Sequence, residues 1–156
     1  MKWLASIGLS GTVLALFAAV TSVAIGWTYL GTKVQIDFEV RRAEARQLLE
    51  IFPADTHDNE VVDDTFAVEA DTALLGIREA RQGYRVRQGG VVVGVILPAT
   101  ARDGYSGDIR ALVGIRRDGT VAGVRVVSHR ETPGLGDKVD LRKSDWVLGF
   151  NHHSLI

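Results

Sequence analysis

The stretch DIRALVGIRRDGTVAGVRVVSH, residues 108–129, predicts two β-strands joined by a tight turn. Apolar residues fill both halves, and Asp118-Gly119 stands between them, a dipeptide that suits a hairpin turn. A second pair of apolar runs, in GYRVRQGGVVVGVILPA at residues 83–99, surrounds Gly89-Gly90. Four strands in antiparallel pairs are the most economical interpretation. We therefore expect an α+β domain with an antiparallel sheet and flanking helices.

The composition limits the function. The chain has 156 residues, a formal net charge of -1 and no cysteine. The near-neutral charge gives no basic stripe, so nucleic acid is not an expected partner. The lack of cysteine excludes disulfides, thiol catalysis, zinc-thiolate sites and iron-sulfur clusters. The length fits one globular domain and an apolar segment.

That apolar segment lies at the start of the chain. No charged residue occurs in residues 3–32, a run that is long enough for the roughly 20 residues of helix that cross a bilayer. A cleaved signal peptide is the alternative, because residues 22–24 (SVA) resemble a cleavage site. The uncharged run continues past that site to Trp27 and Tyr29, which suit an interfacial aromatic belt. We therefore predict a transmembrane anchor over residues 1–32, with the lipid bilayer as a partner.

The residues after the anchor favour a helix that continues from the membrane over residues 33–53. Residues 34–40 alternate like a strand, but apolar residues also recur at helical spacing, and Pro53 would end the helix. Residues 54–71 are acidic and poorly patterned, so we interpret them as a surface connection into a domain over residues 54–156. Basic residues flank both sides of the anchor and leave its orientation open.

Two glycine-containing loops flank the hairpin of residues 108–129. They are DGYSGD, residues 103–108, and HRETPGLGDKVD, residues 129–140. Because a strand-turn-strand path returns to its starting edge, we expect these loops to lie within reach of each other. Asp137 suits the N-cap of a helix through residues 138–150. A glycine loop that opens a helix can bind an anion or an electron-rich ring, although a plain turn fits the same residues.

The stretches DGYSGDIRALVG and DGTVAGVRVVSHRETPGLGDKVDLRKSDWVLGF, together with the N-terminal anchor, closely resemble the G subunit of the Rnf ion-translocating electron transport complex, called Rsx in some bacteria. The E-T-P-G-L-G signature is shared with the flavin-binding domain of the C subunit of the sodium-pumping NADH:quinone reductase. That quinone reductase protein is an alternative, which the Y-S-G and S-D-W details match less well.

The resemblance implies a single-pass protein of the bacterial inner membrane, with its amino terminus in the cytoplasm and its C-terminal domain in the periplasm. It implies that the domain carries FMN and relays electrons among the other subunits of the Rnf complex. That complex couples ferredoxin:NAD oxidoreduction to the translocation of Na⁺ or H⁺. The chain would be part of an enzyme as a subunit, and we do not expect the isolated chain to be catalytic.

The flavin surroundings of the family carry over where its motifs match. They are Tyr105, Ser106 and Gly107 in the first loop and Glu131, Thr132, Pro133, Gly134, Leu135 and Gly136 in the second. In this interpretation Leu135 covers the ring, Thr132 hydrogen-bonds its edge, and the amides from Gly134 to Asp137 stabilise the charge of reduced flavin. We expect no catalytic acid or base and no metal ligand.

One departure concerns the attachment of the cofactor. In the family FMN is bound covalently to a threonine in an S/T-G-A-T motif, and the sequence has no such motif. We therefore expect either a domain that is incomplete at its C-terminus or a membrane-anchored structural or assembly subunit without its own flavin. Trp146 is expected in the core, and His129 is expected either as a polar strand end or as a flavin contact.

Overall fold

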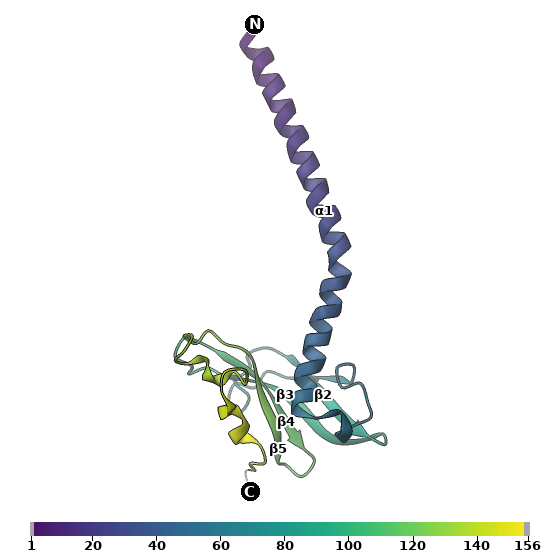
Figure 1. Cartoon of the computed structure of the whole chain (residues 1–156), viewed down its shortest axis with the longest axis vertical. Helices are drawn as coiled ribbons and strands as arrows, with labels where there is room; N and C mark the ends of the chain where they lie inside the picture. Colours follow the sequence, from purple (N-terminus) through teal and green to yellow (C-terminus); the bar gives the residue numbers. More distant parts are fainter. Residues whose placement is uncertain (1, 155–156) are drawn as a thin grey trace. The chain divides into compact units, whose positions relative to one another are not determined.

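The computed structural model describes residues 2–154, with side chains from Gly11 onward (Figure 1). The chain divides into two compact units, residues 1–42 and 43–156. Its elements are helix α1 (Lys2–Ile51), the 3-10 helix η1 (Ala54–Thr56), strands β1 (Thr65–Val68), β2 (Arg81–Gln88), β3 (Val91–Ala101), β4 (Ile109–Arg116) and β5 (Val121–Ser128), and the 3-10 helices η2 (Asp137–Val139) and η3 (Asp145–Phe150).

The described part of the first unit is helical throughout. Among the described residues, one helix, over Gly11–Ile51, is long and apolar enough to cross a membrane. Its threonine hydroxyls are satisfied inside the helix: Thr21 donates to the Phe17 carbonyl at 2.9 Å, and Thr28 bonds in the same way. Such bonds reduce the cost of placing a hydroxyl in hydrocarbon. The predicted continuation of this helix to a point before Pro53 is confirmed, because α1 ends at Ile51.

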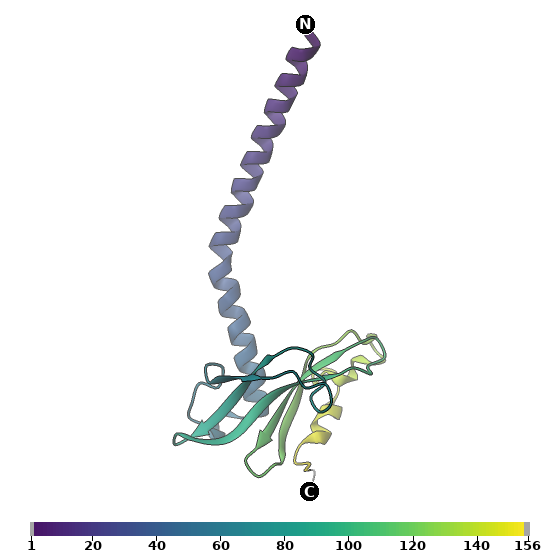
Figure 2. The same ribbon diagram turned by 180° about the vertical axis from the view of Figure 1, so that it is seen from behind.

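The second unit is built on a five-stranded antiparallel sheet in the order β1-β2-β3-β4-β5 (Figure 2). Both predicted hairpins are confirmed, since β2 pairs with β3 and β4 pairs with β5. The first turn contains Gly89 and Gly90 at φ 58° and 76°, and the second contains Gly119 at φ 85°. These left-handed conformations explain why glycine occupies both turns.

Strand β1 corrects the prediction that residues 54–71 are only a connection. It is a four-residue strand at the edge of the sheet. Gly83 on the partner strand leaves space for Phe66, because a Cβ on Gly83 would lie 2.8 Å from Phe66 Cζ. The Arg85 guanidinium lies 4.7 Å from the Phe66 ring centroid. The strand depends on these cross-strand contacts, which the acidic local sequence does not reveal.

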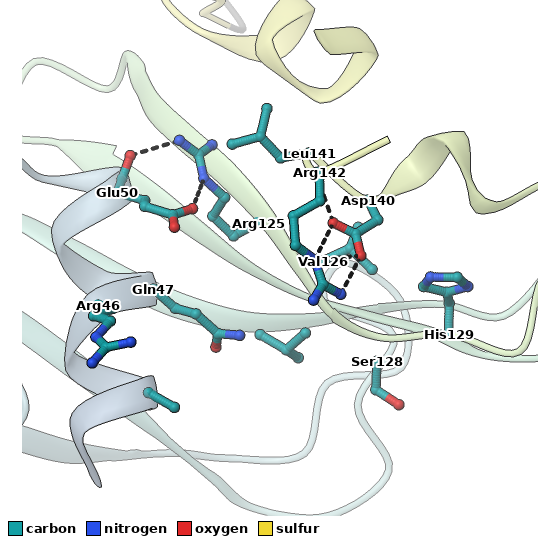
Figure 3. A pocket seen from close by; sticks show the side chains of 12 residues that line it. Arg46, Gln47, Glu50, Arg125, Val126, Ser128, His129, Asp140, Leu141 and Arg142 are labelled. Carbon is teal, nitrogen blue, oxygen red and sulfur yellow. Dashed lines mark hydrogen bonds and ion pairs between the residues drawn. The ribbon is translucent and has the colours of Figure 1, made fainter. Parts of the chain in front are cut away.

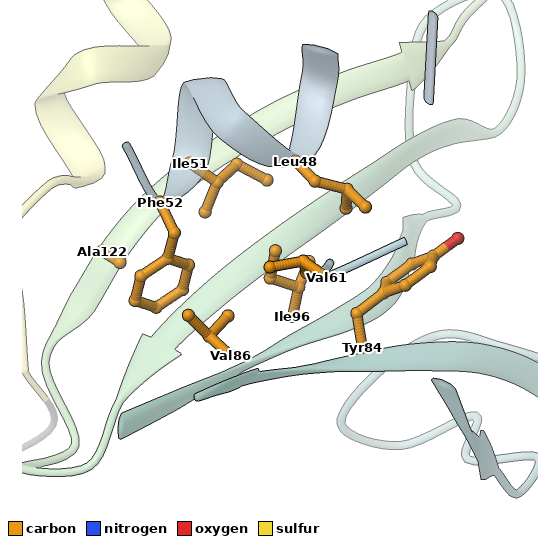
Figure 4. Packing of buried hydrophobic residues seen from close by; sticks show 8 residues of the cluster. All are labelled: Leu48, Ile51, Phe52, Val61, Tyr84, Val86, Ile96 and Ala122. Carbon is orange, nitrogen blue, oxygen red and sulfur yellow. The ribbon is translucent and has the colours of Figure 1, made fainter. Parts of the chain in front are cut away.

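The core of the second unit lies between the last turns of α1 and one face of the sheet (Figure 4). Leu48, Ile51 and Phe52 are buried there and belong to the same cluster as Val86 and Ile96. Removal of this apolar surface from water is the main source of stability for such a contact. The end of α1 is therefore an integral part of the domain.

Two glycines in the sheet allow α1 to approach closely. A Cβ on Gly114 would lie 2.2 Å from Ile51 Cγ2, and a Cβ on Gly94 would lie 2.5 Å from Phe52 Cζ. Neither glycine has positive φ. Their role is thus to leave space for the helix, not to form a turn.

Polar contacts also fix the last turns of α1 to the sheet. The Tyr84 hydroxyl donates to the Glu44 carboxylate, and burial, followed by this bond, raises the pKa of the Tyr84 phenol. Arg125 on β5 donates from Nε to Glu50 Oε2 at 2.9 Å and from Nη2 to the Glu50 carbonyl at 2.7 Å. These charge-assisted bonds constrain the rotation of the helix on the sheet.

Candidate functional site

The two glycine-containing loops meet at one edge of the sheet. β4 begins at Ile109 and its antiparallel neighbour β5 ends at Ser128, so the preceding and following loops emerge together. The Ser106 amide donates to Glu131 Oε1 at 3.1 Å. The expectation that these loops lie within reach of each other is confirmed.

Glu131 is the centre of this loop contact, and it is only 8% exposed. It forms no ion pair with any residue that the structure describes. Glycines border its carboxylate on two sides. A Cβ on Gly104 would lie 3.0 Å from Glu131 Oε1, and a Cβ on Gly136 would lie 2.6 Å from Glu131 Oε2. The glycines therefore allow both loops to close around a buried carboxylate, a group that needs hydrogen-bond donors in place of water.

His129 supports the same arrangement from the end of β5. Its Nδ1 accepts a hydrogen bond from the Glu131 amide at 3.2 Å. An accepting Nδ1 requires the neutral tautomer with the proton on Nε2. His129 thus constrains the backbone of the second loop immediately before the E-T-P-G-L-G signature.

The amides of the second loop do not have the role expected from the sequence. The Thr132 carbonyl accepts hydrogen bonds from the amides of Leu135 at 3.1 Å and Gly136 at 3.0 Å. The Gly134 amide donates to Asp137 Oδ1 at 2.9 Å. The amides predicted to face a ligand run from Gly134 to Asp137, and for the first three of them the prediction is wrong, because these three amides close the turn itself.

The predicted α-helix over residues 138–150 is also wrong. Two short 3-10 helices, η2 and η3, occupy this segment. Asp140 accepts from the Arg142 amide at 2.9 Å, and Ser144 accepts from the Trp146 amide at 3.2 Å. Such local side-chain bonds compete with a continuous helix. Asp137 lies inside η2, and Gly136 is its N-cap.

The short helices create an apolar pocket against the second loop. It has a volume of about 320 Å³ and is lined by Leu135, Gly136, Lys138, Val139, Ser144 and Trp146. Leu135 is 78% exposed and Trp146 is 57% exposed, so both offer apolar surface to a ligand. The prediction of a core position for Trp146 is wrong. Its indole contacts the Phe150 ring edge-to-face, with centroids 5.2 Å apart.

Apart from Glu131, the predicted site residues divide into three groups. Leu135 and Gly136 line the apolar pocket, whereas Tyr105, Ser106 and Gly107 reach it only through the loop contact with Glu131. Tyr105 is 95% exposed. Thr132, Pro133 and Gly134 form the turn and are exposed. Lys138, Val139 and Ser144 also line the pocket and were not predicted. A continuous α-helix was expected over these residues, and it would not have placed them together beside Leu135.

A larger pocket of about 640 Å³ lies between the last turns of α1, β5 and residues 140–142 (Figure 3). Two ion pairs lie in its walls: Arg125 contacts Glu50 at 2.9 Å, and Arg142 contacts Asp140 at 2.5 Å. The Arg142 side chain, followed by its backbone amide, lowers the pKa of Asp140 to about 2. None of the predicted site residues lines this polar pocket, although His129 does. It suits a flat apolar ring poorly.

The comparisons with known proteins agree with this organisation. Residues 104–154 match the family model of the FMN-binding domain, and residues 1–51 match that of the RnfG N-terminal region. The fold and the matched residues thus define a protein with an N-terminal helix and an FMN-binding domain. The pocket beside Leu135 and both loops, from Gly104 onward, lie within the range that matches the FMN-binding domain.

The relatives identify the family. The G subunit of the ion-translocating oxidoreductase complex from Pseudoalteromonas atlantica is 45% identical over 146 residues, which cover 94% of this chain and 67% of the relative. The corresponding protein of Vibrio cholerae El Tor is 40% identical over 148 residues, which cover 95% of this chain and 70% of the relative. That of Pseudomonas aeruginosa PAO1 is 44% identical over 146 residues, which cover 92% of this chain and 66% of the relative. This chain belongs to the family of G subunits of ion-translocating oxidoreductase complexes. It spans about two thirds of the length of these relatives.

Proposed function

We propose that this chain is an electron-transfer flavoprotein subunit of a membrane Rnf complex, and that the pocket beside Leu135 holds the ring of FMN. The observation that carries this proposal is the position of the pocket. It is formed by the E-T-P-G-L-G turn inside the matched FMN-binding domain. Its volume of about 320 Å³ and its mainly apolar walls fit one face of a planar aromatic group.

The lining residues have complementary roles in this proposal. Leu135 and Val139 provide apolar contacts, and the exposed indole of Trp146 provides a flat surface for offset or edge-to-face packing. The Lys138 ammonium stabilises negative charge in the pocket. FMN, when bound, supplies one-electron and two-electron transfer, while the protein sets its position and its electrostatic environment.

Glu131 acts as a positioning residue. Its carboxylate holds the Ser106 loop and packs against Gly136, which itself lines the pocket. Tyr105, Ser106 and Gly107 thus belong to the site as a second loop whose position depends on Glu131. Thr132 contributes its carbonyl to the turn that presents Leu135.

The first 32 residues anchor the protein in this proposal. The uncharged part of α1 spans the bacterial inner membrane once, with the amino terminus in the cytoplasm and the domain in the periplasm. The other subunits of the complex are the partners for electron transfer. Ferredoxin:NAD oxidoreduction, coupled to movement of Na⁺ or H⁺, is the overall reaction that we propose for the assembly.

Flavin content tests the proposal. The complete gene product, purified in a non-ionic detergent, is expected to contain flavin that fluoresces after denaturation. Replacing Leu135 and Trp146 together with alanine is expected to lower the flavin content or shift its midpoint potential. Leu74→Ala is the matched control, because Leu74 is exposed on a different loop. Unchanged content and potential in the double variant would exclude the pocket, and absence of flavin in the natural protein would favour a structural subunit.

A further inference from the structure

We propose that a small pocket beside the start of β4 binds a phosphate group, either free or carried by a lipid headgroup. The pocket has a volume of about 170 Å³, which is below the range of about 300–1,000 Å³ that is typical of drug-sized ligands. Thr100 on β3 lies opposite Arg110 on β4, and both line it together with Arg102. None of these residues lines the proposed flavin pocket.

Two polar atoms in this pocket lack partners. Thr100 Oγ1 and Arg102 Nη2 are buried without a hydrogen bond to any residue that the structure describes. The same guanidinium is held in place, because Arg102 Nε donates to the Gly76 carbonyl at 2.9 Å. Buried polar atoms are almost always satisfied in folded proteins, and an unsatisfied cationic donor is especially costly. Because both residues line the pocket, we take an acceptor bound there as the missing partner of these atoms.

The charge of the pocket specifies the kind of acceptor. Four arginines line it, Arg78, Arg81, Arg102 and Arg110, against the two carboxylates of Glu79 and Asp108, which gives a net formal charge of +2. Among the described residues, none of the four guanidinium groups forms an ion pair.

A phosphate monoester fits this charge better than a carboxylate does. It carries a charge of about -1.5 to -2 at neutral pH and presents three acceptor oxygens. Guanidinium groups bind such oxygens in a bidentate manner. A carboxylate of a protein partner carries one charge on two oxygens and would leave half of the net charge uncompensated.

Calorimetric titration of the full chain in phosphatidylcholine nanodiscs tests the proposal, with inorganic phosphate as the probe at constant ionic strength. Arg102→Gln and Arg110→Gln are each expected to weaken binding at least tenfold. Arg117→Gln is the matched control, since Arg117 is exposed at the β4–β5 turn, and it is expected to change the affinity less than twofold. Arg110 is itself exposed, so its variant reports on binding even if Arg102→Gln does not fold.

A competition experiment with a lipid distinguishes the two sources of phosphate. Phosphatidic acid added to the nanodiscs competes with inorganic phosphate if a headgroup is the ligand, and it leaves the titration unchanged if free phosphate is. The proposal is overturned if the natural chain binds phosphate in neither form, or if Arg110→Gln binds as tightly as the natural chain. Binding of polyglutamate without binding of phosphate would replace it with an acidic protein partner.

Discussion

Replacing Gly136 with alanine tests whether the buried Glu131 carboxylate joins the two loops. The added Cβ would lie 2.6 Å from Glu131 Oε2 and 2.9 Å from Glu131 Cβ. The backbone at Gly136, with φ -95° and ψ -14°, accepts alanine without strain. Glu131 must therefore move, and the Ser106 amide loses its acceptor.

The expected loss of stability can be estimated either as the cost of an added methyl group or as the cost of a lost hydrogen bond. Inserting a methyl group into a filled site costs about 1–3 kcal/mol. Losing a hydrogen bond to a charged group costs about 1.5–3 kcal/mol, and the exposure of Ser106 places this case near the lower end. The two costs do not add, because movement of Glu131 relieves the overlap by breaking the bond. We expect the free energy of unfolding to fall by about 1–2 kcal/mol.

Urea denaturation of the full chain in a non-ionic detergent, followed by circular dichroism, measures this loss. Amide hydrogen exchange at Ser106 reports the broken bond directly and should become faster. Gly149→Ala is the matched control, because no atom lies within 4 Å of its added Cβ. If the Gly136 variant has the same urea midpoint as this control, and if Ser106 exchanges as slowly as in the natural chain, then Glu131 does not join the loops.

Three further predictions concern the rest of the domain. Gly114→Val places methyl groups against the end of α1 and is expected to lower the free energy of unfolding by about 1–3 kcal/mol in urea denaturation. Hydrogen bonds from the side chains of Arg87 and Arg85 on β2 lower the pKa of Asp64, so its stabilising effect should be present above pH about 4 and decline below it. The thermal stability of Asp64→Asn should therefore depend less on pH, between acidic and neutral values, than that of the natural chain. Glu50→Ala should lower the urea midpoint more than Arg125→Met does, because the first leaves a buried cation without its carboxylate and the second leaves a half-exposed carboxylate in water.

The sequence predicted the elements whose signals are local. The two hairpins combine apolar runs with glycine turns, and their positive φ angles match those turns. Strand β1 escaped prediction because its stability comes from Gly83 and Arg85 on the partner strand. The α-helix expected over residues 138–150 failed for the opposite reason, since a good helix start was followed by Asp140 and Ser144, whose side chains bond to the backbone nearby.

The candidate site was predictable at the level of topology. Antiparallel pairing of β4 with β5 brings the Ser106 and Glu131 loops to one edge, and this followed from the sequence. The hydrogen bonds within the second loop could not be predicted from the sequence, because glycine permits many backbone conformations and each gives the neighbouring amides different partners. The exposure of Trp146 was equally hidden, since it depends on where η3 lies relative to Leu135.

These differences change the physical account of the proposed flavin site. Free amides at the start of a long helix would stabilise charge through the helix dipole, but the segment has only 3-10 helices, and the amides of Gly134, Leu135 and Gly136 are used within the turn. The main source of positive charge in the pocket is then the Lys138 ammonium, whereas Glu131 contributes a buried negative charge behind Gly136. These two charges have opposite effects on reduced flavin, so the redox potential of the flavin would depend on side chains that a single substitution can alter. The positions of the two loops would depend on the Glu131 carboxylate.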